Sequence, residues 1–343
     1  MSIGVAIIGG GIFAREEHLP AVQASKDLTL KAIWSRSLES AQNLGADADV
    51  DIYCEDSGSG KSFNDLLKRV DIQAVIIELP IPNQPEYIRR ALSAGKHVLS
   101  EKPIAENLKD AQELTRWYHE DHDSKRVTWS VAENFRYLNS FEYAREQVHR
   151  AGRLLGFRVK VYSMVKPGGK YFETAWRKNP THQGGFLLDG GVHHTAGLRL
   201  LLGSENIVTR LSAYTNQNQE HLPPVDTVDA TMKTHTGATG TFSLSMGTTF
   251  TGSEWSIACE GGSVSISRST VTTVFDGKEE KVEIEDERSG VPPEVRKWGE
   301  ALSAGKRNEK QIPEEALADL ELLENMLKSG EANGQPMDCR LQI

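Results

Sequence analysis

The apolar positions in the first third of the chain fall into short β-branched runs separated by amphipathic stretches. Runs that are apolar throughout are typical of strands buried on both faces, and the stretches between them have the spacing of helices that cover such a sheet. We predict strands at 3–8, 28–34, 50–54, 74–79, 97–99 and 127–131. Six such units indicate a doubly wound parallel sheet, the α/β Rossmann arrangement, over residues 1–130.

The pattern changes after residue 131. One helix is predicted at 141–151, and helices close the chain at 292–304 and 313–328. Between them, apolar and polar positions alternate, which indicates strands with one buried face and a mostly antiparallel sheet. The clearest alternating segments are 157–165, 227–236 and 238–246. Residues 131–343 are therefore predicted to form a second, α+β domain with a large open sheet.

Length and charge narrow the function classes. A chain of 343 residues exceeds the size of one hydrophobic core, and its net charge of −9 argues against binding nucleic acid or anionic membranes. The first apolar run reaches glycines after about six residues, too short for a signal or membrane helix. The three cysteines show no metal-ligand spacing. We expect a soluble, cytoplasmic protein with no metal site.

A glycine-rich turn follows the first strand directly. Gly9, Gly11 and Ala14 form a G-x-G-x-x-A sequence, with Ile12 and Phe13 inside it. The first glycine permits a tight turn, the second lets the backbone approach a pyrophosphate, and the small alanine lets helix and strand pack closely. A glycine turn that binds nothing is the alternative. The strand before the turn and the β/α alternation after it favour a dinucleotide site.

The end of the second strand predicts which dinucleotide binds. An acidic residue at this place would accept hydrogen bonds from the adenosine ribose, but the sequence reads Trp34, Ser35, Arg36, Ser37. Ser35 and Arg36 can donate hydrogen bonds to a 2′-phosphate, and the guanidinium offsets its charge. The sequence therefore favours NADP(H) over NAD(H). The alternative is that Arg36 is a solvated surface residue.

Two short motifs carry groups able to move a proton. Lys102, between Glu101 and Pro103, follows the fifth strand at the sheet edge where such folds bind ligands, and there it can donate a proton or polarise a carbonyl. Asp189 and His193 are four residues apart, so a helix that begins near Asp189 places both on one face as an acid/base pair. The alternative makes Asp189 a helix N-cap and His193 a core histidine.

Taken together, the motifs at 9–14, 101–103 and 184–193 resemble those of the Gfo/Idh/MocA oxidoreductases, which include glucose-fructose oxidoreductase and inositol dehydrogenase. The resemblance covers essentially the whole chain and is strongest to a fungal-type branch. It implies that Lys102, Asp189 and His193 form the catalytic set. By this analogy His193 is the general acid/base on the reacting oxygen, Lys102 polarises that oxygen, and Asp189 orients the pair.

The resemblance also implies further residues around the cofactor. Besides those of the glycine turn and the second strand, these are Leu79, Pro80, Asn83, Glu101, Lys102, Trp176 and Arg177. Asn134 is expected to line the same cleft. His194 stands where many relatives carry an acidic or polar residue, which leaves open whether it or His193 carries the proton. His18 is interpreted as a capped structural histidine, with a place in the cleft as the alternative.

The resulting expectation is an oxidoreductase that moves a hydride between a nicotinamide and a small carbonyl or alcohol substrate, such as a sugar, polyol, aldehyde or ketone. A non-catalytic dinucleotide sensor of the same fold is the first alternative, and nicotinamide-assisted glycoside cleavage is the second. The resemblance implies a homodimer formed through the exposed sheet face. The substrate itself stays open, because loop geometry sets the shape of the pocket.

Overall fold

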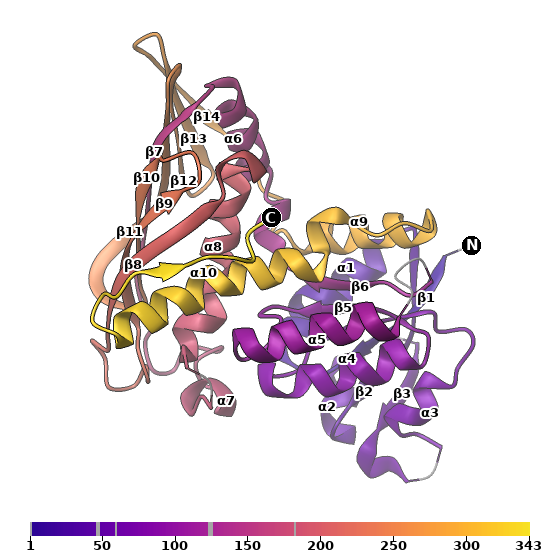
Figure 1. Ribbon diagram of the computed structural model, residues 1–343. Helices are drawn as coiled ribbons and strands as arrows, with labels where there is room; N and C mark the ends of the chain where they lie inside the picture. Colours follow the sequence, from indigo (N-terminus) through magenta and orange to yellow (C-terminus); the bar gives the residue numbers. More distant parts are fainter. Residues whose placement is uncertain (1, 46–48, 59, 123–125, 182) are drawn as a thin grey trace. The chain divides into compact units, whose positions relative to one another are not determined.

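The computed structural model describes residues 2–45, 49–58, 60–122, 126–181 and 183–343, which form two compact units (Figure 1). The first unit comprises Met1–Asn134 and Arg288–Ala316, and the second comprises Phe135–Glu287 and Leu317–Ile343. The sequence prediction divided the chain once, after residue 130. It therefore assigned to the second domain a segment that belongs to the first unit.

The first unit contains a six-stranded, all-parallel sheet in the order β3-β2-β1-β4-β5-β6. This order reverses beside β1, as in the doubly wound folds that bind dinucleotides. All six strands lie where the apolar runs predicted them, which confirms the fold class. Their bounds are β1 Ile3–Ile8, β2 Leu28–Ser35, β3 Asp51–Cys54, β4 Ala74–Ile77, β5 His97–Glu101 and β6 Trp129–Ala132.

Helices cover both faces of this sheet. Successive side chains of β1 point to opposite faces, and the side chains on both faces are buried. Val5 and Ile7 belong to a core cluster with Trp298, while Ala6 and Ile8 are also inaccessible to solvent. Trp298 lies on the apolar face of α9, which explains why α9 packs in this unit. The helices are α1 Leu19–Ala24, α2 Leu38–Gly45, α3 Phe63–Leu67, α4 Gln84–Ser93, α5 Leu108–Asp121 and α9 Val291–Ser303.

The second unit is built on a nine-stranded sheet in the order β14-β13-β12-β11-β7-β10-β9-β8-β15. Only the β7–β10 pair is parallel among the described strands of this sheet, so the predicted mostly antiparallel sheet is confirmed. The strands are β7 Leu154–Met164, β8 Val208–Asn216, β9 Thr227–Thr234, β10 Thr239–Ser245, β11 Gly247–Cys259, β12 Gly262–Ser267, β13 Thr270–Phe275, β14 Lys278–Glu283 and β15 Met337–Asp338.

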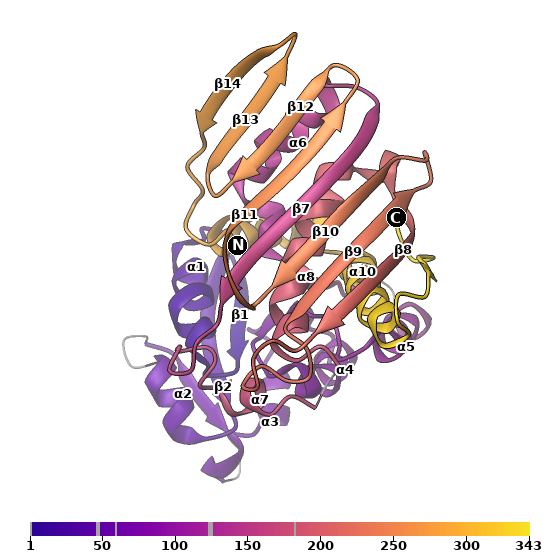
Figure 2. The same ribbon diagram turned by 90° about the vertical axis from the view of Figure 1, so that its left-hand side faces the viewer.

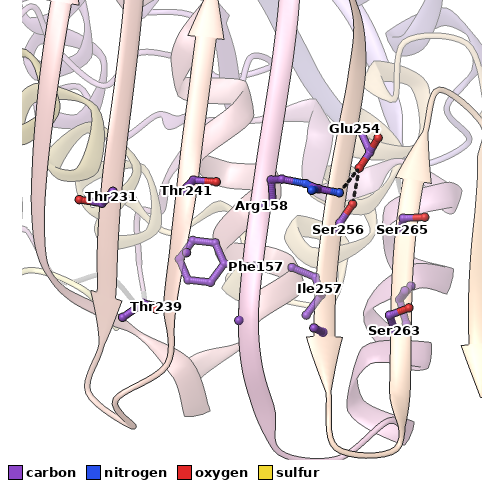
Figure 3. Close-up of a pocket in the computed structure, with 14 residues that line it drawn as sticks. Phe157, Arg158, Thr231, Thr239, Thr241, Glu254, Ser256, Ile257, Ser263 and Ser265 are labelled. Carbon is purple, nitrogen blue, oxygen red and sulfur yellow. Dashed lines mark hydrogen bonds and ion pairs between the residues drawn. The ribbon is translucent and has the colours of Figure 1, made fainter.

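One face of this large sheet is covered by helices and the other is open (Figure 2). Along β9, Val228 and Met232 are buried, whereas Thr231 and Lys233 are exposed on the opposite face. The open face is hollowed over β7 and β10–β12, where small hydroxyl side chains surround the Arg158–Glu254 ion pair (Figure 3). The helices are α6 Asn139–Arg150, α7 Ala175–Lys178, α8 Gly185–Leu202 and α10 Pro313–Glu331, of which α10 belongs to the second unit from Leu317 onward.

Short helical turns complete the fold. Those before residue 100 are the π-helical η1 Ala14–His18 and the 3-10 turns η2 Glu55–Ser57 and η3 Ile81–Asn83, and those after it are η4 Asn134–Tyr137, η5 Ser204–Asn206 and η6 Glu309–Gln311. Over the described parts of the chain, every helix is too short or too polar to span a bilayer.

Candidate active site

The glycine turn after β1 is held against two neighbouring strands. The Gly9 N–H donates to the Trp34 carbonyl at 2.7 Å, and the Glu78 N–H donates to the Ile8 carbonyl at 2.7 Å. Gly9 has a φ of +120°, and a Cβ there would lie 2.2 Å from the Glu78 carbonyl oxygen. Only glycine fits this position, because both the backbone conformation and the neighbouring strand exclude a side chain.

The next glycine of the turn is open to a ligand. Gly11 is exposed, and a Cβ built on it meets no atom within 4 Å. Helical structure begins at Ile12, and Ala14 is fully buried in the core of the first unit. Backbone N–H groups at such a helix start bind phosphate, so this turn fits a dinucleotide pyrophosphate.

The far end of β2 carries the two residues predicted to select the cofactor. Ser35 is 6% exposed, and Arg36 beside it is exposed. Among the described residues, no hydrogen bond or ion pair engages the Arg36 guanidinium. An exposed guanidinium at this place can form charge-assisted hydrogen bonds with a phosphate group.

The carboxyl ends of β4 and β5 lie next to each other in the sheet. Leu79 and Pro80 are half-buried after β4, and Asn83 is exposed at the end of η3. Lys102 is half-buried after β5, and its backbone N–H donates to the Glu101 carboxylate at 3.1 Å. The turn that carries Lys102 is thus held by the preceding side chain.

Helix α8 carries the second group of predicted catalytic residues. It begins at Gly185, so Asp189 lies one turn inside the helix and is not its N-cap, and the prediction that the helix starts near Asp189 was wrong. Asp189 and His193 are one turn apart on the same helix. The Asp189 carboxylate accepts a hydrogen bond from Arg177 Nε at 2.7 Å, and the Arg177 guanidinium lies 4.1 Å from the centre of the Trp176 ring.

The two histidines of α8 contact the same aromatic residue, Phe135, in different ways. His193 stacks on Phe135, with 4.9 Å between ring centres and 15° between ring planes. His194 contacts the edge of Phe135 and lies 5.6 Å from the ring of Trp255, on the side of the sheet. His193 therefore lies face to face with Phe135, whereas His194 lies against both Phe135 and Trp255.

Comparison with known proteins identifies the family. Residues 3–128 match the oxidoreductase family described as an NAD-binding Rossmann fold, and residues 145–338 match its C-terminal alpha/beta domain. A dehydrogenase of Fusarium mangiferae, FPY6, is 40% identical over 97% of both chains. The chain belongs to the Gfo/Idh/MocA oxidoreductase family. It is an NAD(P)-dependent oxidoreductase of that family.

The chain is also similar to two proteins whose names describe ketone reduction. The dTDP-3,4-didehydro-2,6-dideoxy-α-D-glucose 3-reductase of Streptomyces violaceoruber is 34% identical over 60% of this chain and 55% of its own length. KijD10, a 3-ketoreductase of Actinomadura kijaniata solved with NADP and TDP-benzene, has a TM-score of 0.78 at 22% identity and covers 96% of this chain and 98% of its own. The second likeness shows a shared fold.

The predicted site residues of this Gfo/Idh/MocA chain are divided between the units. The first unit holds the glycine turn, Ser35, Arg36, Glu101 and Lys102. The second holds Trp176, Arg177, Asp189 and His193. Asn134, expected to line the cleft, donates its side-chain N–H to the Ser289 carbonyl within the first unit. This hydrogen bond joins the end of the segment Met1–Asn134 to the start of the segment Arg288–Ala316, both of which belong to the first unit.

Three further residues near these motifs were not predicted. Glu78 and Glu294 are buried carboxyl groups of the first unit, and Phe135 is the aromatic partner of His193. A sequence signal existed for two of them. Glu78 follows a fully apolar strand directly, and Glu294 lies on the apolar face of α9 between Val291 and Val295, where a charged residue is out of place.

Proposed function

We propose that this protein is an NADP(H)-dependent oxidoreductase that transfers a hydride between the nicotinamide and a carbonyl or alcohol group of a small substrate. The proposal rests on two features at the carboxyl edge of the first sheet. The open turn at Gly11 follows β1, and the half-buried Lys102 follows β5. Ligands of open parallel sheets bind at this edge. A lysine there can act on the group that exchanges the hydride.

The proposed preference for NADP(H) over NAD(H) depends on Arg36. This exposed guanidinium, unpaired among the described residues, stands at the end of β2, where NAD-binding proteins carry a carboxylate. A 2′-phosphate there gains charge-assisted hydrogen bonds from a fork of donors. KijD10, which shares the fold, was solved with NADP.

Three side chains handle the proton in this proposal. When bound, the dinucleotide supplies or accepts the hydride. His193 donates a proton to the substrate oxygen or removes one from it, and Lys102 stabilises the negative charge that develops on that oxygen. Asp189, held by Arg177, orients the substrate hydroxyl and His193. Stacking on Phe135 restricts rotation of the His193 ring, which lowers the entropy cost of reaching the reactive geometry.

The substrate class we propose is a sugar or polyol with a carbonyl or secondary alcohol. The reductase from Streptomyces violaceoruber acts on a keto-sugar by its name, and the Fusarium mangiferae relative is named a dehydrogenase. Reduction of a keto group to an alcohol, as in the name of the first relative, is chemistry that a lysine and a histidine can support.

We also propose that the open sheet face of the second unit binds a second copy of this chain. Small hydroxyl residues such as Thr231, Thr241 and Ser256 allow two sheets to approach closely, and no helix of the described chain covers them (Figures 2 and 3). Light scattering after size exclusion should give a dimer. The variant Thr241→Arg should give a monomer, whereas Ser93→Arg, at an exposed hydroxyl residue of α4 in the first unit, should leave the dimer intact.

A cofactor-cycling screen tests the enzymatic proposal. Purified protein is mixed with NADPH or NADH and a panel of aldoses, keto-sugars, aldehydes and ketones, and with the oxidised cofactors and the matching alcohols. We expect turnover with at least one sugar-type substrate and a higher kcat/KM with NADPH than with NADH. Turnover should fall by at least about 100-fold in Lys102→Ala and in His193→Ala, the size of a lost acid/base or charge-stabilising group.

The controls separate catalysis from folding and from sensing. Lys109→Ala changes an exposed lysine on α5 and should leave turnover unchanged. If Lys102→Ala and His193→Ala both keep full turnover while binding NADPH normally, the proposed roles are wrong. NADPH binding without turnover on any member of the panel would instead support a dinucleotide sensor.

A further inference from the structure

A buried histidine joins two glutamates below the glycine turn of the first unit. His18 is fully buried, and its Nε2 lies 2.7 Å from Glu78 Oε1 and 2.9 Å from Glu101 Oε1. Both glutamate side chains are also largely shielded from solvent, at 4% and 13% exposure. We refer to these three residues as the His18 cluster. His18 occupies the N-cap position of α1, but its side chain makes no capping hydrogen bond to that helix.

The local backbone around His18 is unusual. Residues Ala14–His18 form a π-helical segment inside the helix that follows the glycine turn, and the Leu19 N–H bonds to the Ala14 carbonyl five residues back. Short π segments in α-helices are frequent at functional sites. The segment places a fully buried imidazole one turn after the predicted phosphate-binding residues.

The His18 cluster connects the glycine turn to Lys102. Glu101 uses one carboxylate oxygen for His18 and the other for the Lys102 N–H, which donates to it at 3.1 Å. Glu78 lies under the turn, since its backbone carbonyl is the atom that a Cβ on Gly9 would meet. Removing His18 therefore frees the Glu101 carboxylate that holds the Lys102 backbone, whereas Glu78 acts on that carboxylate only through His18.

Several charged groups from different elements face the His18 cluster. The members of the cluster come from η1 and from the ends of β4 and β5. The charge of Lys102 lowers the pKa of Glu78. Glu294 interacts electrostatically with His18, Glu101 and Glu133. Burial raises the pKa of Glu294 well above its usual range, which favours the neutral carboxyl. The imidazole of His18 is then the group that balances the buried carboxylates.

His18 and Glu78 affect each other's pKa. Burial lowers the pKa of His18, but the charges and hydrogen bonds of Glu78 and Glu101 outweigh it and raise the pKa well above 6.5. Burial raises the pKa of Glu78 to about 7, against the opposing charge of His18. The two carboxylates therefore favour the protonated form of His18, and His18 in turn favours the ionised form of Glu78.

We propose that His18 and Glu78 are positioning residues for hydride transfer, because they hold Glu101 and through it the Lys102 backbone in the reactive conformation. This inference rests on the proposed function of Lys102. A reacting group displaced by about 1 Å typically loses about 100-fold in rate, although it keeps its chemistry. Loss of the cluster should therefore lower kcat and leave the affinity for NADPH nearly unchanged.

The first experiment compares two histidine variants of the same unit. His18→Gln keeps a side-chain N–H near the two glutamates but removes the positive charge. The control His97→Gln changes a half-buried histidine at the opposite end of β5, where its ring bonds to Thr128. We expect His18→Gln to lower kcat by about 10- to 100-fold with an NADPH Kd within about threefold of wild type. His97→Gln should change kcat by less than about twofold.

The second experiment uses the titration of Glu78. In wild type, kcat should fall as the pH drops below about 7, because protonation removes the charge of Glu78 beside His18. Glu78→Gln should lose this bend and remain at the lower, acidic value of kcat across pH 6–9. A residue that only fills space would change the height of the profile without removing a bend.

The outcomes separate this inference from the proposed function. If Lys102→Ala abolishes turnover while His18→Gln and Glu78→Gln keep kcat within about twofold and retain the wild-type bend, the cluster is structural only. If Lys102→Ala keeps turnover, the proposed function fails first. The ligand atoms of the cluster lie within 4.8 Å of one another, so a divalent metal is a competing occupant. Stoichiometric metal in the purified protein, absent from His18→Gln, would overturn the proposal.

Discussion

The buried carboxyl of Glu78 makes a quantitative prediction about folding. Its pKa is raised by burial from 4.5 to about 7 in the folded chain. Between these two pH values the folded protein binds more protons than the unfolded chain, so its stability falls as the pH rises through this window. Each tenfold difference in proton affinity between the folded and unfolded chains corresponds to about 1.4 kcal/mol, so the loss of stability at pH 8 is about 3 kcal/mol.

The substitution Glu78→Gln removes the ionisable group and keeps its size. Glutamine carries no charge at any pH, so it avoids the penalty above pH 7; the pKa of about 7 already includes the attraction between Glu78 and His18. We expect the variant to equal wild type in stability near pH 4.5 and to be more stable by about 1–3 kcal/mol at pH 8. The same variant is expected to be slower in turnover, so stability and activity should change in opposite directions.

Urea unfolding followed by circular dichroism at pH 4.5, 6, 7 and 8 measures this difference. The matched control is Glu39→Gln, which removes an exposed carboxyl on α2 and should give a curve parallel to that of wild type. The reasoning is refuted if the stability difference between Glu78→Gln and wild type does not grow with pH, or if the variant is the less stable protein at pH 8.

Further substitutions at Arg36, at the two glycines of the turn and at Phe135 test the cofactor and proton sites. Arg36→Ala should weaken NADPH binding by about 10- to 100-fold, the value of one charge-assisted contact, and leave NADH binding unchanged in a fluorescence titration; equal losses would contradict the NADP(H) assignment. Gly11→Ala should fold normally, since its Cβ meets no atom, yet bind NADPH at least tenfold more weakly, whereas Gly9→Ala should lower the melting temperature; the reverse order would refute the geometry of the turn. Phe135→Leu should lower kcat by about tenfold while Phe135→Tyr keeps it, because only the aromatic ring stacks on His193; equal values would show that the stack is irrelevant.

The sequence was most informative where strands are buried on both faces. All six strands of the first sheet could be predicted, because their apolar runs are continuous. In the second sheet, β7, β9 and β10 alternate clearly, but the outer strands β12–β14 carry serine, threonine and charged residues over most positions. β14 has no buried residue at all, so hydrophobic pattern alone could not reveal it.

Long-range placement limited the rest of the prediction. The amphipathic pattern of α9 predicts a helix, but it does not tell which domain that helix covers, and the boundary after residue 130 missed its return to the first unit. The same limit applies to the His18 cluster. His18, Glu78 and Glu101 are separated by 60 and 23 residues along the chain, so only the pairing of β1, β4 and β5 brings them together.

The destination of the hydride tests the central claim most directly. The protein is incubated with its best carbonyl substrate and NADPH deuterated at nicotinamide C4 on the transferred face, and the product is analysed by mass spectrometry. We expect one deuterium on the new carbinol carbon for each NADPH oxidised, and labelled product that forms at least about 100-fold more slowly with Lys102→Ala. Product formation without deuterium, or without any net change in cofactor, would contradict it.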